Sequence, residues 1–249
     1  MGSVLTDIPG KSGRAMLMAL AAGPTTSEAV ADLAHGTLRN KRAQLVDALQ
    51  GRMTDHQRLM LQLQLAHVRH LDQQIEALDE EVAKRLGPFE AQSTHLDMIP
   101  RVSQRGAEVI LAEVGPDVTR FPSADHLTSW AGMCPGSNES AGKRRKARMR
   151  KGKQTLRRTL TEAGQATGRS KGTYLGATYQ RIAARRGSKK AAIAVGRSIL
   201  EIAYHALRDG VAYEELGVNY YNERKKDAVV RNAVKRLERL GYKVMVDAA

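Results

Sequence analysis

One long segment of the sequence, Gln57 to Arg85, contains neither glycine nor proline and is apolar at regular intervals. The intervals alternate between three and four residues, which is the heptad spacing of a coiled-coil helix. The positions of this seam are Leu61, Gln64, Val68, Leu71, Ile75, Leu78 and Val82. The segment predicts one long helix, ended by Gly87 and Pro88, whose seam pairs with a second helix of the chain or with another copy of it. A homo-oligomer is therefore expected.

Shorter amphipathic segments follow the same helical period. Helices are expected at Asp125 to Ala131, Thr155 to Ala166, Ser188 to Arg208 and Lys226 to Leu240. Asp209 and Gly210 are expected to close the third of these helices. One possible strand, Tyr242 to Val246, has no evident partner strand. The sequence thus predicts an all-α fold in which strand content is marginal.

Positive charge is concentrated in one interior segment, Lys143 to Arg158. The chain carries a net charge of +14, and ten of the 16 residues in this segment are Lys or Arg. These residues are Lys143, Arg144, Arg145, Lys146, Arg148, Arg150, Lys151, Lys153, Arg157 and Arg158. Cations this close repel one another unless an anion neutralises them, and a nucleic acid does so with release of its counterions. The segment predicts nucleic-acid binding, with a merely solvated patch as the alternative.

A second group of cations brackets Gly187 and Ser188: Arg185, Arg186, Lys189 and Lys190. Ser188 is expected to be the N-cap of the helix that follows, which puts two lysines in its first turn. The helix dipole disfavours cations there, and a bound phosphate would remove that conflict. A phosphate contact and ordinary solvated lysines both remain open.

Other features exclude several classes of protein. The longest apolar run, Ala15 to Ala22, is far shorter than the roughly 18 residues that a membrane helix needs. No secretory signal pattern opens the chain, and a single cysteine, Cys134, forms no internal disulfide. His67 and His70 lack a carboxylate partner for a metal. We expect a cytoplasmic protein, with no membrane contact, no metal ligands and no cofactor in this chain.

Two similar turns precede helical segments. Ile8 to Arg14 and Ile99 to Arg105 share Ile, Pro, Ser and Arg at the same spacing. Each resembles the helix-hairpin-helix element, in which a tight turn presents backbone N–H groups to a phosphate. The element has glycine on both sides of its hydrophobic residue, whereas the second copy has Arg101 and Ser103. Either copy can bind a phosphate or be purely structural.

The segment from Pro135 to Gly142 has the composition of a loop and carries Ser140 directly before the basic run. A serine hydroxyl is a weak nucleophile unless its surroundings take its proton or stabilise negative charge. Neighbouring guanidinium and ammonium groups could bind a phosphodiester and stabilise its transition state. Composition alone leaves Ser140 open as a nucleophile or as an ordinary loop residue.

Three segments together resemble a known family. They read HLDMIPRVSQRGAEVILAEVG, FPSADHLTSWAGMCPGSNESAGKRR and RKGKQTLRRTLTEAG, and the similarity extends from about His95 to Gly217. They resemble the C-terminal transposase domain of the insertion-sequence one-ten family, the bridge-RNA-guided recombinases. The heptad segment and Ser3 to Ala22 are similar to the middle region of that family. This implies four segments: 1–56 and 57–92 as the helical middle region and coiled coil, 93–217 as the transposase domain, and 218–249 as a helical tail.

The resemblance implies a chemical role for Ser140. In the family, the serine before the Gly-Lys of the basic loop attacks a DNA phosphodiester and holds the strand covalently during exchange. A structured guide RNA selects the DNA by base pairing, so DNA and RNA are the implied partners. The family also has an N-terminal domain in which four acidic residues bind Mg²⁺. This chain opens inside the middle region, so it is expected to be a truncated product or an excerpt without that domain, inactive alone.

Two other functions fit the same residues. In one, the chain is a non-catalytic DNA- or RNA-binding module and Ser140 is incidental. In the other, the heptad helix assembles the protein and the positive charge only keeps it in solution. Binding that weakens steeply with salt separates nucleic-acid binding from assembly. A covalent protein–DNA species separates the recombinase from the binding module.

Overall fold

Helices form nearly all of the secondary structure in the computed structural model. It describes residues 2–51, 53–136, 139–140, 142–144, 151–224 and 226–246, and for Ser140 and Arg144 the backbone alone. The predicted all-α fold is confirmed, since the described strands are two-residue segments of one hairpin. The chain divides into two units, Met1–Arg85 and Leu86–Ala249. The four-segment division stays a prediction.

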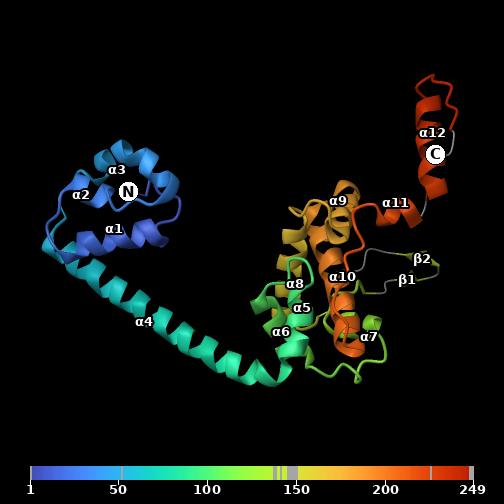
Figure 1. Cartoon of the computed structure of the whole chain (residues 1–249), viewed down its shortest axis with the longest axis horizontal. Helices are drawn as coiled ribbons and strands as arrows, with labels where there is room; N and C mark the ends of the chain where they lie inside the picture. Colours follow the sequence, from blue (N-terminus) through green and yellow to red (C-terminus); the bar gives the residue numbers. More distant parts are fainter. Residues whose placement is uncertain are drawn as a thin grey trace. The chain divides into compact units, whose positions relative to one another are not determined.

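The first unit begins with a small cluster of short helices (Figure 1). The cluster comprises α1 (Lys11–Ala22), α2 (Ser27–Ala31), the 3-10 helix η1 (Gly36–Lys41) and α3 (Arg42–Leu49). Its buried apolar residues are Leu5, Met16, Val30, Ala31, Ala34 and Leu45. This small core explains why the helices fold together although each is short.

Helix α4 (Asp55–Leu86) is the long helix predicted from the heptad spacing (Figure 1). It begins at a capping box: the Thr54 backbone N–H donates to Gln57 Oε1 at 3.0 Å, and the Gln57 N–H donates to Thr54 Oγ1 at 3.3 Å. It ends, as predicted, where the 3-10 helix η2 (Gly87–Phe89) starts. Its length therefore follows from two local signals and an unbroken interior.

The central seam of α4 is exposed. Val68, Leu71, Ile75 and Leu78 are between 37% and 65% exposed, so no described segment of the first unit covers them. A helical hairpin within the chain stays a prediction. Pairing with a second copy stays a prediction.

The second unit is a helical bundle built around α10 (Ser188–Asp209). Helices α5 (Glu90–Asp97), α7 (Ala124–Trp130), α8 (Gln154–Thr167) and α9 (Tyr174–Arg186) pack against α10, and α6 (Gln104–Val114) packs against α5 and α8 (Figure 1). Fully buried residues of this core include Leu96, Ile99, Leu127, Leu156, Leu160, Leu175, Ile199 and Leu200. Helices α11 (Tyr220–Arg224) and α12 (Lys226–Glu238) follow.

Two glycines allow α8 and α10 to approach closely. A Cβ on Gly164 would lie 2.2 Å from the carbonyl oxygen of Ala192, and one on Gly196 would lie 2.5 Å from that of Leu160. Real side-chain atoms do not approach a backbone oxygen so closely. The backbones of the two helices are thus in direct contact at the centre of the core.

Strands form at a different place from the one predicted. Residues Tyr242 to Val246 have no regular structure, and Tyr242, Met245 and Val246 are exposed. This prediction was wrong because alternating apolar residues form a strand only where a partner strand completes the hydrogen bonds. The described strands are β1 (Glu139–Ser140) and β2 (Lys143–Arg144), at the segment predicted to be a loop. No helix in the described ranges is both long and apolar enough to cross a membrane.

Candidate nucleic-acid interface

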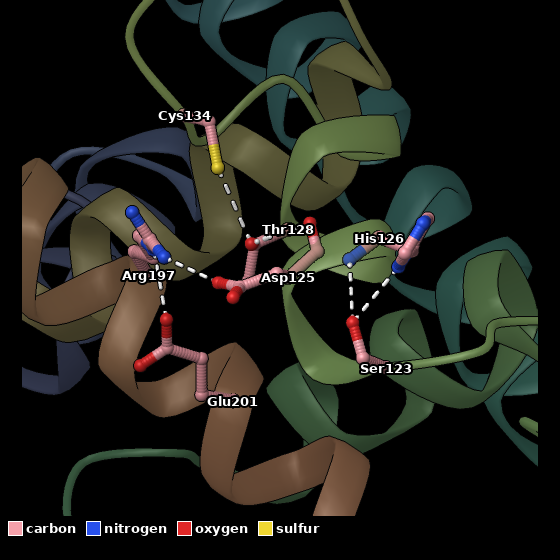
Figure 2. Close-up of polar contacts among 7 residues, drawn as sticks. All are labelled: Ser123, Asp125, His126, Thr128, Cys134, Arg197 and Glu201. Carbon is pink, nitrogen blue, oxygen red and sulfur yellow. Dashed lines mark hydrogen bonds and ion pairs between the residues drawn. The ribbon is translucent and has the colours of Figure 1, made fainter.

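Helix α7 is fixed to α10 by a group of polar side chains (Figure 2). Arg197 of α10 donates from Nη2 to Asp125 Oδ1 at 2.7 Å and from Nε to Glu201 Oε1 at 2.8 Å. Burial opposes the charge on Arg197, but the hydrogen bond and ion pair with Glu201 hold its pKa above the usual value. Ser123 caps α7, since its Oγ accepts from the backbone N–H of His126 and also lies 2.8 Å from His126 Nδ1. Of these contacts, the Arg197–Asp125 ion pair joins α7 to α10, and the Ser123–His126 contacts cap α7 itself.

The chain leaves the core just after α7. Met133 is buried, Cys134 is half-buried and Pro135 is exposed. Cys134 Sγ lies 3.3 Å from the Oγ1 of Thr128, which is fully buried in α7 (Figure 2). The start of the segment that carries Ser140 is therefore fixed to the same helix.

The chain returns to the core at Gly152. A Cβ on Gly152 would lie 2.5 Å from the carbonyl group of Ala131 and from the nitrogen of Gly132. Lys153 Nζ then lies 5.6 Å from the centre of the Trp130 ring and 3.3 Å from Glu113 Oε2. Both ends of the intervening segment, residues 135–151, thus meet at the turn that follows α7. We call this segment the basic loop.

Replacing Gly152 by Ala is expected to displace the return of the basic loop, because no space exists for the added Cβ. Forcing an extra carbon against backbone atoms costs about 1–3 kcal/mol. Urea denaturation measures this loss, and DNA affinity should fall with it. Gly23→Ala is the control, since its Cβ would meet no atom within 4 Å. Equal stability of the two variants would contradict the close contact.

Ser140 lies in β1, the first strand of the hairpin within the basic loop. The strands are antiparallel, and Ser140 pairs with Lys143 while Glu139 pairs with Arg144. Gly142, at the turn, has a φ of 72°, a conformation that glycine adopts without strain. The prediction of an irregular loop was therefore wrong at Glu139 and Ser140, which form a strand paired with Lys143 and Arg144. In Figure 1 the hairpin lies outside the helical bundle.

The described cations of the basic run occupy different environments. Lys143 and Lys151 are exposed, and Arg157 is half-buried in α8. Lys153 pairs with Glu113, and Arg158 Nε pairs with Glu162 Oε1 at 2.9 Å, a hydrogen bond that raises the pKa of Arg158. The remaining members fall outside the description: Arg145, Lys146, Arg148 and Arg150, with the side chain of Arg144. Their contact with a nucleic acid stays a prediction.

The second predicted group lies where α9 meets α10. Arg185, Arg186, Lys189 and Lys190 are all exposed, and the two lysines lie in the first turn of α10 as expected. The N-cap, however, is Gly187 and not Ser188. Gly187 has a φ of 86°, which ends α9, and its carbonyl accepts from the Ala191 N–H, which starts α10. A phosphate contact here stays a prediction.

The two helix-hairpin-helix-like turns precede α1 and α6, but their backbones differ. Gly10 caps α1 with an extended backbone at φ −67°. In the second turn Arg101 has a φ of 69°, after Pro100, and the Val102 N–H donates to the Ile99 carbonyl at 3.0 Å. This is a type II turn with arginine where glycine is usual. Phosphate binding by either turn stays a prediction.

Two arginines close to the predicted residues were missed from the sequence. Arg181 lies one helical turn before Arg185 on α9, so the spacing of four residues could have indicated it. Arg224 lies on α11 and lines the same pocket as Arg181 and Arg185. That proximity arises from tertiary packing, which no local pattern predicts.

Within the described ranges, no group of three or more His, Cys, Asp or Glu side chains could hold a metal ion. That acidic residues of a separate domain bind Mg²⁺ stays a prediction. The described His, Cys, Asp and Glu side chains do not fit a magnesium site.

A helical core that presents a serine hairpin beside a basic run has the features expected of a protein that acts on nucleic acids. Residues 93–180 match the model of the Transposase IS116/IS110/IS902 family, over about a third of the chain. The match runs from α5 to α9 and includes the hairpin and the basic run. It supports DNA transposition or recombination as the general function, and DNA as the partner. No curated protein matches the chain.

Proposed function

We propose that this chain supplies the nucleophile of a DNA recombinase, and that the nucleophile is Ser140. The observation that carries the proposal is the position of Ser140. It lies within the matched residues, on a hairpin directly before the basic run, and in a loop whose two ends are fixed at one turn. A hairpin outside the helical bundle could take part in strand cleavage without any change in the helical core.

The proposed reaction is a phosphoryl transfer. Ser140 Oγ attacks a phosphodiester of one DNA strand, a bond from Oγ to phosphorus forms, and a bond from phosphorus to a sugar oxygen breaks. The serine loses one proton and the released sugar hydroxyl gains one, so no cofactor is consumed. A hydroxyl from a second DNA end then attacks the phosphoserine, joins the strands and restores the serine. Bond energy is conserved in the covalent intermediate.

The basic run has a separate task, which is to bind the backbone and stabilise charge. The reacting phosphate spreads negative charge over its non-bridging oxygens, and fixed cations nearby stabilise that charge. Lys143, which pairs with Ser140 across the hairpin and is exposed, is the nearest described cation in sequence. Arg157, half-buried, and the exposed Arg158, which pairs with Glu162, continue the basic run into α8.

The resemblance extends the proposal to two further partners. A structured RNA would choose the DNA by base pairing, and the protein would bind its backbone and shape. Carboxylates that hold Mg²⁺ would come from a separate domain or protein. A pair of copies joined through the exposed seam of α4 would supply one serine for each of two DNA ends.

The test is the covalent intermediate itself. The protein is incubated with labelled DNA, a guide RNA and a Mg²⁺-binding acidic domain of the same family, and the products are separated in denaturing detergent. Label that stays with the protein, mapped by mass spectrometry to the peptide that contains residue 140, supports the proposal. Label on another residue refutes the assignment. Binding without any adduct leaves the chain a non-catalytic nucleic-acid-binding module.

Binding should depend steeply on salt, since each phosphate neutralised on duplex DNA contributes about 0.9 to the slope of log K against log salt. Changing Lys143, Arg145, Arg148 and Arg150 together to Gln should reduce the slope by roughly three to four. Fluorescence anisotropy at several salt concentrations measures it. The control changes four cations of α12 to Gln, namely Lys226, Arg231, Lys235 and Arg236, so the net charge is equal. A slope that is flat in the unchanged protein would favour an assembly role instead.

A further inference from the structure

A basic pocket lies between α9 and α11, away from the basic loop in sequence. It has a volume of about 420 Å³. The residues that line it are Thr178, Arg181, Ile182, Arg185, Tyr221 and Arg224. Half of these side chains are arginines, and none is acidic. Of these residues, Arg185 alone was predicted from the sequence.

The spacing on α9 explains how that helix forms one wall. Four residues of the wall share one face of the helix, because the last three lie three, four and seven residues after the first. They are Thr178, Arg181, Ile182 and Arg185. Arg224 reaches the same pocket from α11, more than 40 residues after Thr178. The pocket therefore exists only when α11 packs against α9.

A cluster of tyrosines makes that packing specific. The rings of Tyr174 and Tyr221 are stacked at 5.4 Å, and their hydroxyl groups lie 3.0 Å apart. Tyr220 packs edge-on against both rings at 5.1 and 5.5 Å. Arg224 Nη1 donates to Tyr220 Oη at 3.2 Å. Aromatic contacts and hydrogen bonds of this kind fix α11, and with it Arg224.

A carboxylate fixes the segment that leads into α11. Glu215 Oε1 accepts from the Tyr174 N–H at 2.7 Å and from the Gly217 N–H at 2.9 Å, and Tyr213 Oη donates to Glu215 Oε2 at 3.2 Å. The Glu215 carboxylate thus accepts hydrogen bonds at the start of α9 and does not line the pocket. The pocket keeps an excess of positive charge.

The arginines of the pocket are arranged to bind an anion. The guanidinium carbon of Arg181 lies 4.8 Å from the centre of the Tyr221 ring, and a guanidinium held on a ring keeps N–H groups at its edge for a ligand. In the described part of the chain, no carboxylate pairs with Arg181, Arg185 or Arg224. By contrast, Arg158, Arg197 and Arg208 are each paired with carboxylates. Three unneutralised guanidinium groups around one cavity repel one another until an anion binds.

We propose that this pocket binds a backbone phosphate of a polynucleotide, as a second anchor for the nucleic acid beside the basic loop. The anion specificity follows from the pocket itself, while the choice of a polynucleotide rests on the proposed function. The Tyr221 ring, stacked with Tyr174 and contacted by Arg181, serves as a platform for the arginine. The pocket accordingly binds phosphate and reads no base.

Arg181→Gln and Arg224→Gln test the pocket, with a 20-base-pair DNA duplex and an RNA hairpin as the two ligands. Each change should weaken binding by about tenfold and lower the salt slope by about 1. If affinity falls for the duplex alone, the ligand of the pocket is DNA, and if it falls for the hairpin alone, the ligand is RNA. If affinity falls for both, the pocket binds the backbone of either polynucleotide. Arg231→Gln, an exposed arginine of α12 outside the pocket, is the matched control. Unchanged affinity for both ligands overturns the proposal.

A second pair of variants tests whether the Tyr221 ring supports Arg181 for binding, apart from any effect of Tyr221 on folding. Tyr221→Phe keeps the ring and should bind nearly as well as the unchanged protein, whereas Tyr221→Leu removes the platform and should lose about tenfold in affinity. Circular dichroism verifies that both remain folded. If Tyr221→Leu binds normally while folded, the platform role is refuted.

The covalent adduct distinguishes this proposal from the proposed function. Pocket variants that bind normally, in a protein that forms the adduct on Ser140, refute the pocket and leave the recombinase intact. Pocket variants that lose binding, in a protein that forms no adduct, support the pocket and refute the recombinase.

Discussion

Ser140→Ala is expected to abolish the covalent protein–DNA adduct while DNA binding stays near normal. Removing the hydroxyl removes the atom that bonds to phosphorus, and loss of a nucleophile lowers the rate by at least about a thousandfold in enzymes of this kind. The basic run and the helical core are unchanged by the substitution. Denaturing electrophoresis of labelled DNA measures the adduct, and anisotropy measures binding.

The matched control for this change is Ser137→Ala, a second serine of the basic loop. It removes a hydroxyl three residues away and should leave the adduct unaffected. An adduct that survives in Ser140→Ala would refute the assignment of the nucleophile. Loss of the adduct in both variants, with normal binding, would show that the loop needs its serines for folding and would equally remove the case for Ser140.

Gly164→Ala and Gly196→Ala are both expected to destabilise the second unit strongly, although each adds only one methyl group. Each Cβ would lie 2.5 Å or less from a carbonyl oxygen of the facing helix, so α8 and α10 must separate. Overpacking costs about 1–3 kcal/mol and occasionally more, and here both partners are backbone atoms that cannot rotate away. Alanine returns about 1 kcal/mol through its higher helix propensity. The net loss is therefore expected to reach about 2 kcal/mol, the upper end of this difference.

Thermal or urea denaturation measures that loss, which for a chain of this size lowers Tm by roughly 4–8 °C. Gly51→Ala is the control, because an added Cβ there would meet no atom within 4 Å. Stability equal to that of the control would show that α8 and α10 are farther apart than described. Because α8 carries part of the basic run, DNA binding should weaken together with stability.

Much of the fold could be predicted because its long helices carry local signals. The heptad spacing and the lack of glycine and proline placed α4 to within two residues at its start, and α10 was predicted to begin at Ser188 and to end before Gly210. The short helices α2 and α11 were not predicted, because five residues hold too little periodicity. The strand predicted at residues 242–246 failed because pairing depends on a partner that no local pattern supplies.

The candidate site was predictable only where it depends on composition. The density of cations from Lys143 to Arg158 is visible in the sequence, and so is the serine before it. The role of Gly152 is not, since its contact with Ala131 joins residues that are distant in the chain. For the same reason the approach of Arg224 to Arg181 could not be foreseen. Distances across the fold, and not residue types, set these features.

The meeting of both ends of the basic loop at the turn after α7 has a consequence for evolution. A segment that departs and rejoins at one point imposes no strain on the scaffold when its length changes, because loop closure depends only weakly on the number of residues. Insertions, deletions and exchanges of sequence between Pro135 and Lys151 are thereby decoupled from the packing beneath. New substrate preferences can arise in that stretch while the supporting architecture is inherited unaltered.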